Sequence, residues 1–455
     1  MKKIKYILLI SFLFYQILSN GQTNGDWTDL DKRQTPNWYE DAKFGIFIHW
    51  GLYSVPSWAT KSNADGFGSG YSEWYWQRLN EKSLKIHPEF TAFHHKNYGP
   101  NFKYQDFTQF FHAELFDPDH WADVFKKSGA KYVVLTSKHH EGFALWKSKY
   151  AWNWNAFDVG PHRDLAGDLI KSVKNKGLKM GFYYSLYEWY HPLYKNDINS
   201  YVQNYMVPQI KELVNLYEPD IFWPDGEWDR SDTTWHSTEI VRWLFNHPKV
   251  KDNIVINDRW GNNTKGKHGS FYTTEYGAGN IDNNSPKRPW EECRGIGQSF
   301  GYNRNEYLED YSSAKELIHS LVSIVSNGGN LLLNIGPTAD GRIPVIMEQR
   351  LMEIGNWLKV NGSAIYGTRK LKTEIKSIKK HNFFTENDSS IYLILTKWDE
   401  KIELEGTFKP KSINLLGSNE SISFIKKGNK IIFNSPRFTP ENIPCQSAWV
   451  FELKK

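Results

Sequence analysis

Residues 219–228 read Pro-Asp-Ile-Phe-Trp-Pro-Asp-Gly-Glu-Trp. Residues 221–223 form a short apolar run after a helical segment, which predicts a buried strand of a parallel sheet. Pro224 has no backbone N–H to give to a sheet, so the strand is expected to end there. Asp225 then lies just beyond the carboxyl end of the strand, with Gly226 leaving room beside it.

The position of Asp225 fits two interpretations. In a β/α barrel, catalytic side chains gather at the carboxyl ends of the strands. Trp223 and Trp228 flank this acid, and an aromatic wall beside a carboxylate suits a sugar ring. The alternative is a helix-capping or turn aspartate with a structural role only. This stretch alone leaves both interpretations open.

Working outward, helical patterns alternate with apolar strands. Strands are predicted at 44–50, 132–140, 179–185, 219–225, 253–260, 270–276 and 329–337, and helices at 117–129, 165–176, 200–217, 234–246, 312–326 and 343–360. Such an alternation predicts a parallel sheet, and six to eight strands fit one α/β domain, a (β/α)8-like barrel, better than an open sheet. Residues 52–115 show no clear period and are predicted to be a long loop over one face.

The pattern changes from about residue 370 onward. Short β-like runs at 390–396, 430–433 and 448–452 are separated by polar turns, which is typical of an antiparallel β-sandwich. We therefore expect a catalytic barrel over residues 23–365 and a C-terminal sandwich over residues 366–455.

The first 22 residues have the pattern of a secretory signal peptide. Basic residues precede the apolar stretch 6–18, which is too short to span a membrane, and Ser19 and Gly21 are small residues before a cut at Gln22. We expect a protein exported to the periplasm or the medium, with no membrane partner. Loss of three lysines with this leader lowers the net charge from +5 to +2, and so small a positive charge does not indicate binding to nucleic acid.

The predicted strands share one feature, which is that nearly every one ends in a residue able to bind a sugar or move a proton. These residues are His49, His139, His140, Tyr183, Trp223, Asp225, Arg259 and Glu275. A barrel with structural demands alone would end its strands in Gly, Asn, Asp and Ser. The set is more specific than any one member and indicates an active site.

A metal site is the less favoured interpretation of His139-His140-Glu141. Adjacent residues of a strand point to opposite faces, so two histidines on one metal would need a bulge. No His-x-His or His-x-x-x-His accompanies the pair, and Cys293 and Cys445 each stand alone. We therefore expect no metal and no other cofactor, and histidines that bind hydroxyl groups.

Asp225 is the candidate nucleophile and needs a second carboxyl group as acid. Retaining glycosidases hold the two groups about 5–5.5 Å apart, and inverting ones hold them further apart. Glu275 follows a predicted strand, Glu291 and Glu292 follow a loop slightly later, and Glu73 lies in the long aromatic loop. Sequence spacing alone does not rank these candidates.

Several motifs resemble those of the α-L-fucosidases of glycoside hydrolase family 29, over about residues 35–368. They are Phe44-Gly-Ile-Phe-Ile-His-Trp-Gly, Lys138-His-His-Glu-Gly-Phe, Arg163-Asp-Leu, Trp223-Pro-Asp-Gly-Glu-Trp, Asn257-Asp-Arg-Trp-Gly, Trp290-Glu-Glu-Cys, Ser299-Phe-Gly-Tyr-Asn-Arg and Gly328-Gly-Asn-Leu-Leu-Leu-Asn-Ile-Gly-Pro. Their common order along the chain makes chance a poor explanation.

The resemblance implies an exo-acting, retaining α-L-fucosidase with an irregular barrel followed by a β-sandwich. It implies Asp225 as nucleophile and Glu275 as acid/base, with Glu291 as the alternative seen in other branches. It implies a fucose pocket made of His49, Glu73, Trp74, His139, His140, Tyr183, Trp223, Arg259 and Phe300. The expected partner is a fucosylated oligosaccharide or polysaccharide, and the role of Glu227 is open.

Two other functions fit parts of the sequence. A fucose-binding protein without catalysis would keep the pocket, although the retained Asp225 and Glu275 argue against it. A metal-dependent hydrolase would be centred on His139 and His140. The linkage and the aglycone, whether of a glycan, a glycoconjugate or a sulfated fucan, stay open at this stage.

Overall fold

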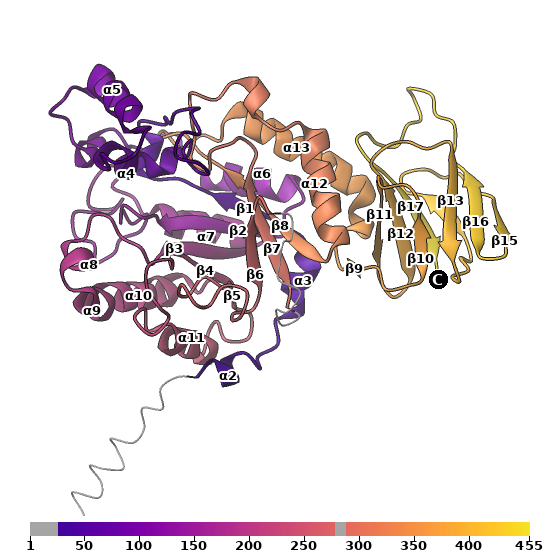
Figure 1. Ribbon diagram of the computed structural model, residues 1–455, viewed down its shortest axis with the longest axis horizontal. Coiled ribbons are helices and arrows are strands. Elements are labelled where there is room, and N and C mark those ends of the chain that lie inside the picture. The colour runs from indigo at the N-terminus through magenta and orange to yellow at the C-terminus, as the bar shows by residue number, and fades with distance from the viewer. Residues whose placement is uncertain (1–25, 278–287) are drawn as a thin grey trace, which may run out of the picture.

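The first part of the chain forms a sheet of eight parallel strands, and the last part forms two antiparallel sheets (Figure 1). The structure is a computed structural model that describes residues 26–277 and 288–455. The predicted leader, residues 1–22, lies outside the described residues. Within these two ranges no helix is long and apolar enough to cross a bilayer.

The parallel strands follow the order β5-β4-β3-β2-β1-β8-β7-β6. They are β1 (Phe44–Ile48), β2 (Tyr132–Lys138), β3 (Lys179–Ser185), β4 (Ile221–Asp225), β5 (Val255–Ile256), β6 (Tyr272–Glu275), β7 (Trp290–Gly295) and β8 (Gly329–Ile335). Because β1 pairs with β8, this is the circular order of a barrel, interrupted between β5 and β6. There the N–H groups of Ser270 and Phe271 donate to Ile256 O at 2.8 and 3.3 Å. The predicted irregular β/α barrel is confirmed.

The strands are buried on both faces, as the apolar runs predict. All residues of β1, β2 and β8 are buried. Alternate side chains of β1 divide between two cores, with Phe47 in the barrel interior and Ile46 and Ile48 facing the helices. The same alternation places the large aromatic residues Tyr183 and Trp223 inside the barrel.

The helices that precede and follow the strands cover the barrel. They are α2 (Trp27–Leu30), α3 (Asn37–Ala42), α4 (Tyr75–Asn80), α5 (His87–Tyr98), α6 (Pro118–Lys127), α7 (Leu165–Asn175), α8 (Pro192–Asn196), α9 (Ile198–Tyr201), α10 (Val207–Tyr217), α11 (Ser237–Asn246), α12 (Ala314–Ser326) and α13 (Val345–Asn361). The helix α6 shows how sequence sets a boundary, because Asp117 accepts from the N–H groups of Asp119 and His120, and Pro118 opens the first turn.

Two sequence-based predictions need correction. Residues 52–115 are not only loop, since they contain α4 and α5. Only Phe90 and His94 of α5 are buried, so its apolar face is narrow and the sequence shows no clear helical period there. The strand β7 was not predicted, because Trp290-Glu-Glu-Cys-Arg-Gly lacks an apolar run. Its carboxylates are buried with partners instead, as described below.

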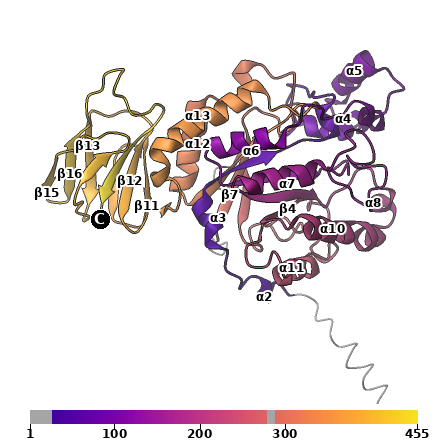
Figure 2. The same ribbon diagram turned by 180° about the vertical axis from the view of Figure 1, so that it is seen from behind.

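The C-terminal sheets form the predicted antiparallel sandwich. One has the order β10-β13-β16-β15 and the other β14-β17-β12-β11-β9. The strands are β9 (Arg369–Lys370), β10 (Ile375–Ser377), β11 (Asn382–Glu386), β12 (Ser390–Leu395), β13 (Lys401–Gly406), β14 (Ile413–Leu415), β15 (Phe424–Lys427), β16 (Lys430–Asn434) and β17 (Trp449–Lys454). The sandwich lies against α12 and α13, as Figure 2 shows from behind, and Trp357 Nε1 donates to Ala448 O at 2.8 Å.

Candidate active site

A cavity of about 360 Å³ lies at the carboxyl ends of the barrel strands. The sequence-predicted residues that line it are His49, Glu73, Trp74, His139, His140, Tyr183, Trp223, Asp225, Arg259, Glu275 and Phe300. The structure therefore brings together every predicted site residue except Glu291, the alternative acid. Further lining residues are Phe47, Phe67, Gly68, Tyr71, Arg78, Trp228, Lys265 and Cys293.

Asp225 is the last residue of β4, which corrects the prediction that the strand ends at Pro224. Pro224 stays in register opposite Tyr184, and its carbonyl accepts from Asn257 Nδ2 at 2.9 Å. The missing proline N–H is tolerated because Pro224 faces the side of β5, whose pairing with β4 ends at Phe222 and Ile256. Gly226 follows with φ +75°, and a Cβ there would approach Tyr187 Cβ to 2.4 Å, so this turn needs glycine.

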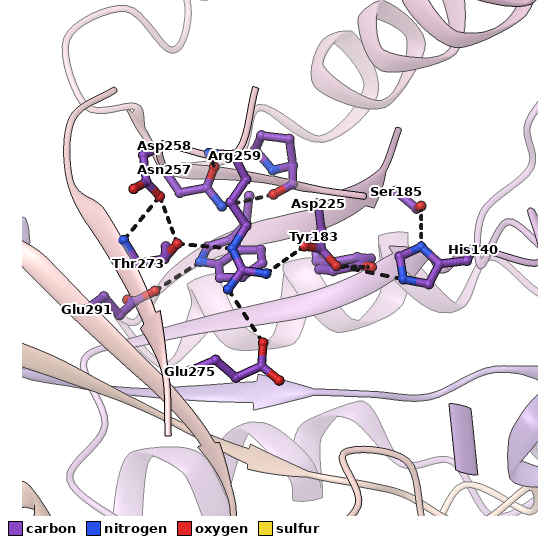
Figure 3. Close-up of polar contacts among 12 residues, drawn as sticks. His140, Tyr183, Ser185, Asp225, Asn257, Asp258, Arg259, Thr273, Glu275 and Glu291 are labelled. Atoms are coloured by element: carbon purple, nitrogen blue, oxygen red, sulfur yellow. Dashed lines mark hydrogen bonds and ion pairs between the residues drawn. The ribbon is translucent and has the colours of Figure 1, made fainter. Parts of the chain in front are cut away.

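Each oxygen of the Asp225 carboxylate accepts one strong hydrogen bond (Figure 3). Arg259 Nη1 donates to Oδ1 at 2.6 Å, and Tyr183 Oη donates to Oδ2 at 2.8 Å. His140 Nε2 lies 3.9 Å from Oδ2. The carboxylate is thereby fixed in orientation beside the cavity that it lines.

Arg259 is itself held by residues of the neighbouring strand region. Its Nε donates to Thr273 Oγ1 at 3.0 Å, and Thr273 Oγ1 donates to Asp258 Oδ1 at 2.7 Å. The guanidinium also lies over the Trp223 ring, 4.7 Å from its centroid. Arg259 is thus a rigid cation between Asp225 and Glu275.

Glu275 ends β6 and faces the cavity. Tyr71 Oη donates to its Oε1 at 3.2 Å, and Arg259 Nη2 lies 3.6 Å from its Oε2. Burial raises the pKa of this carboxyl group, the charge of Arg259 opposes the rise, and the charge of Asp225 adds to it. Glu275 is therefore a carboxyl group of the cavity lining whose environment favours the protonated form.

Glu291 is placed differently, in the interior of the barrel and outside the cavity lining. Tyr39 Oη and Tyr132 Oη donate to its Oε2 at 2.9 and 2.5 Å, and Trp223 Nε1 donates to Oε1 at 2.9 Å. Both oxygens are occupied by fixed donors. The geometry favours Glu275 over Glu291 as the second carboxyl group.

The three histidines present neutral rings to the cavity. Burial lowers the pKa of both His49 and His139 to about 3. His49 Nδ1 lies 2.6 Å from Asn334 Oδ1, and His140 Nδ1 lies 2.6 Å from Ser185 Oγ. In each case the other ring nitrogen is left for a ligand, and a neutral imidazole can donate to or accept from a hydroxyl group.

His139 and His140 both reach the cavity, contrary to the expectation that neighbours on a strand point apart. The strand β2 ends at Lys138, its register shifts between Thr136 and Lys138, and the two rings lie 4.1 Å apart. Across residues 26–277 and 288–455, no group of three or more His, Cys, Asp or Glu side chains is arranged to hold a metal ion.

The remaining predicted residues come from loops over the barrel. Glu73 is buried, and its Oε2 accepts from Gly301 N at 2.8 Å and Ser299 Oγ at 3.3 Å. Burial raises the pKa of Glu73 to about 7. The rings of Trp74 and Trp228 are stacked on each other, with their centroids 5.9 Å apart.

Two missed lining residues had a signal in the sequence. Tyr71 stands two residues before Glu73 in the same aromatic stretch. Cys293 stands two residues after Glu291, on the same face of β7, and the stagger of the barrel brings it level with Glu275, its register partner.

Glu227 is buried with Oε2 unpartnered, and burial raises its pKa to about 7, with the charge of Asp225 adding to the rise.

Comparison with known proteins agrees with this site. The family profile described as Alpha-L-fucosidase matches residues 14–363, and the Alpha-L-fucosidase C-terminal domain matches residues 376–454. The Homo sapiens tissue alpha-L-fucosidase is 41% identical over 440 residues, and the plasma alpha-L-fucosidase is 42% identical over 445; each alignment covers 94% of this chain and 91% of the relative. The crystal structure of Thermotoga maritima alpha-fucosidase in complex with fucose is 38% identical, with a TM-score of 0.79, over 94% of this chain and 99% of that chain.

Proposed function

The chain belongs to the α-L-fucosidase family, glycoside hydrolase family 29, whose members act on terminal α-L-fucose, and we propose that it does so by a retaining double displacement. The observation that carries the proposal is the fixed pair of carboxyl groups. Asp225 is oriented by two donors, and Glu275 lies across the same Arg259 guanidinium.

In the first step Asp225 attacks the anomeric carbon of the fucosyl unit. The bond between that carbon and the glycosidic oxygen breaks, and Glu275 gives its proton to the departing oxygen. The result is a fucosyl ester on Asp225 and a free aglycone alcohol. The raised pKa of Glu275, caused mainly by burial, keeps the proton available for this transfer.

In the second step Glu275, now a carboxylate, takes a proton from water. The water oxygen attacks the anomeric carbon, and the ester bond to Asp225 breaks. Two inversions give net retention. Formation of the ester removes the negative charge of Asp225, so the pKa of Glu275 falls and the group becomes a base when one is needed.

The cavity supports an exo-acting enzyme specific for a single terminal sugar. A volume of about 360 Å³ accommodates one monosaccharide, and the neutral histidines with Glu73 offer donors and acceptors to its hydroxyl groups. Phe300 lies 4.9 Å from His49 between ring centroids, and its apolar ring would receive the C6 methyl group of fucose.

The anomer released first tests the retaining mechanism. Proton NMR of early hydrolysis of an aryl α-L-fucoside should show α-L-fucose before it equilibrates with the β anomer. A 2-deoxy-2-fluoro-fucosyl fluoride should label Asp225, as peptide mass spectrometry would reveal, and the Asp225→Asn variant is the matched control. Initial release of β-L-fucose would mean an inverting enzyme.

Two further points follow from the sequence. Fucose binding without hydrolysis of any fucoside would favour the alternative of a non-catalytic binding protein. We also propose that the leader directs export and is then removed, which leaves the mature protein in the periplasm or the medium. N-terminal sequencing of protein recovered from the periplasm or medium should begin near residue 22.

A further inference from the structure

The rim of the cavity is aromatic on the side of Glu275. Phe67 is 71% exposed and Tyr276 is 36% exposed. The Phe67 ring lies 6.0 Å from that of Tyr276 and 5.6 Å from that of Tyr71, whose hydroxyl donates to Glu275. Tyr71 and Tyr276 therefore lie next to the proposed proton donor, and Phe67 packs against both while it presents a large apolar surface to solvent.

The loop that carries Phe67 is held in place. Arg78 Nη2 donates to Gly68 O at 3.2 Å, and its guanidinium lies 4.9 Å from the centroid of the Trp74 ring in the pocket wall. Gly68 has φ +80°. An exposed aromatic ring on a fixed loop is suited to stacking on a sugar, because its position requires little ordering on binding.

A cation completes this side of the rim. Lys265 is exposed and lines the same cavity. Phe67 and Glu275 line that cavity too, so the long side chain of Lys265 can reach a sugar that leaves the cavity past Glu275.

We propose that Phe67 and Lys265 form a subsite for the sugar next to fucose, and that this sugar carries an anionic group, either a sulfate ester or a carboxylate. The proposal rests on the function proposed above, because a cavity filled by one fucosyl unit leaves the next sugar on the rim. Phe67 stacks on that sugar, and Lys265 pairs with its negative group.

The test compares substrates that differ only in the second sugar. One disaccharide is neutral, one bears a sulfate ester and one bears a carboxylate. Since an exposed ion pair is worth up to about 1 kcal/mol, we expect kcat/KM for one anionic substrate to exceed that for the neutral one by about 3- to 5-fold at low ionic strength. The faster of the two anionic substrates shows whether the second sugar carries a sulfate ester or a carboxylate, and 0.5 M salt should remove the preference for it.

The quantity to follow is the ratio of kcat/KM for the anionic disaccharide to that for the neutral one. Lys265→Gln should reduce this ratio to about 1, Lys265→Glu should bring it below 1, and Lys265→Arg should keep it. Lys267→Gln, on the same loop outside the cavity lining, is the matched control and should keep the ratio. Phe67→Ala should lower kcat/KM for all three disaccharides. The rate on α-L-fucosyl fluoride, which has no sugar aglycone, normalises each variant for folded enzyme.

A wild-type ratio of 1 for both anions, or a preference that survives in Lys265→Gln, overturns the subsite. Failure of the proposed function looks different, because then α-L-fucosyl fluoride itself is not hydrolysed with retention.

Discussion

Arg259 Nη1 lies 2.6 Å from Asp225 Oδ1, and this ion pair is buried at the end of the barrel. The second terminal nitrogen of the same guanidinium lies 3.6 Å from Glu275 Oε2. One rigid cation thus contacts both proposed catalytic carboxyl groups. When Asp225 is esterified, Arg259 loses its closest counter-charge and acts more strongly on Glu275, which links the proton affinity of Glu275 to the state of Asp225.

Asp225→Ala or Asp225→Asn should nearly abolish turnover with the fold intact. Removal of the nucleophile removes the covalent route, and we expect kcat to fall on the order of 10³-fold or more. Azide should rescue the Ala variant and give a fucosyl azide of inverted configuration. Asp229→Asn is the matched control, since this exposed acid contacts Tyr194 and not the cavity. Near-normal hydrolysis of an aryl fucoside by the Asp225 variants would disprove the assignment.

Glu275→Ala should damage cleavage of a natural fucoside far more than that of an activated aryl fucoside, because a good leaving group departs without a proton. The pH profile of kcat/KM should also change. Wild-type activity should decline as pH rises through the raised pKa of Glu275, since the acid form is then lost, and the variant should lack this basic limb.

Glu291→Ala should instead destabilise the protein and affect both substrates similarly. The change leaves the donors of Tyr39, Tyr132 and Trp223 buried without an acceptor, at a cost of at least about 3 kcal/mol of unfolding free energy. Thermal unfolding measures this loss. If Glu291→Ala alone shows leaving-group dependence and a lost basic limb, Glu275 is structural and the assignment is reversed.

Tyr71→Phe should move the basic limb of the pH profile to higher pH. The Tyr71 hydroxyl stabilises the ionised form of Glu275, so its removal raises the pKa of that carboxyl group further. One hydrogen bond is worth about 0.5 to 1 pH unit. Tyr75→Phe, which loses a contact with His94 away from the cavity, should leave the limb in place. A limb that moves to lower pH in Tyr71→Phe would contradict this contact.

Activity should not require a metal ion. Asn334 and Ser185 occupy Nδ1 of His49 and His140, and the neutral rings are placed to contact sugar hydroxyls. Extended dialysis against EDTA should leave kcat and KM unchanged. Loss of activity that zinc or calcium restores would support a metal-dependent hydrolase centred on His139 and His140.

Glu141→Gln should stabilise the fold in mild alkali. Burial raises the pKa of Glu141 from 4.5 to about 8, so the folded protein keeps a proton that the unfolded chain releases. Stability contributed by this group is therefore lost as pH rises between these values. The difference between the thermal unfolding midpoints of Glu141→Gln and wild type should become more positive as the pH is raised from 4.5 to 8.5. Glu309→Gln, at an exposed site, should show no such trend.

Most of the barrel was predictable because parallel strands buried on both faces have continuous apolar sequences. The strands β1, β2, β3, β4 and β8 all have such runs, and each was predicted. The strand β7 was missed because its acids are buried only with the help of hydrogen-bond and ion-pair partners, which the absence of an apolar run conceals. Glu291 bonds to Tyr39 and Tyr132, and Glu292 Oε1 accepts from Arg294 Nε at 2.9 Å.

The sequence by itself determined which residues meet, because the carboxyl ends of parallel strands converge at one end of a barrel. Asp225, Arg259 and Glu275 end or follow strands, and they line one cavity with the residues that the family resemblance implied. Only the tertiary structure separated Glu275 from Glu291. Each has an aromatic chain neighbour, so local sequence does not distinguish them. The stagger of β6 and β7 places Glu275 at the mouth and Glu291 among interior donors from residues up to 252 positions away, and a contact of that range is decided by packing.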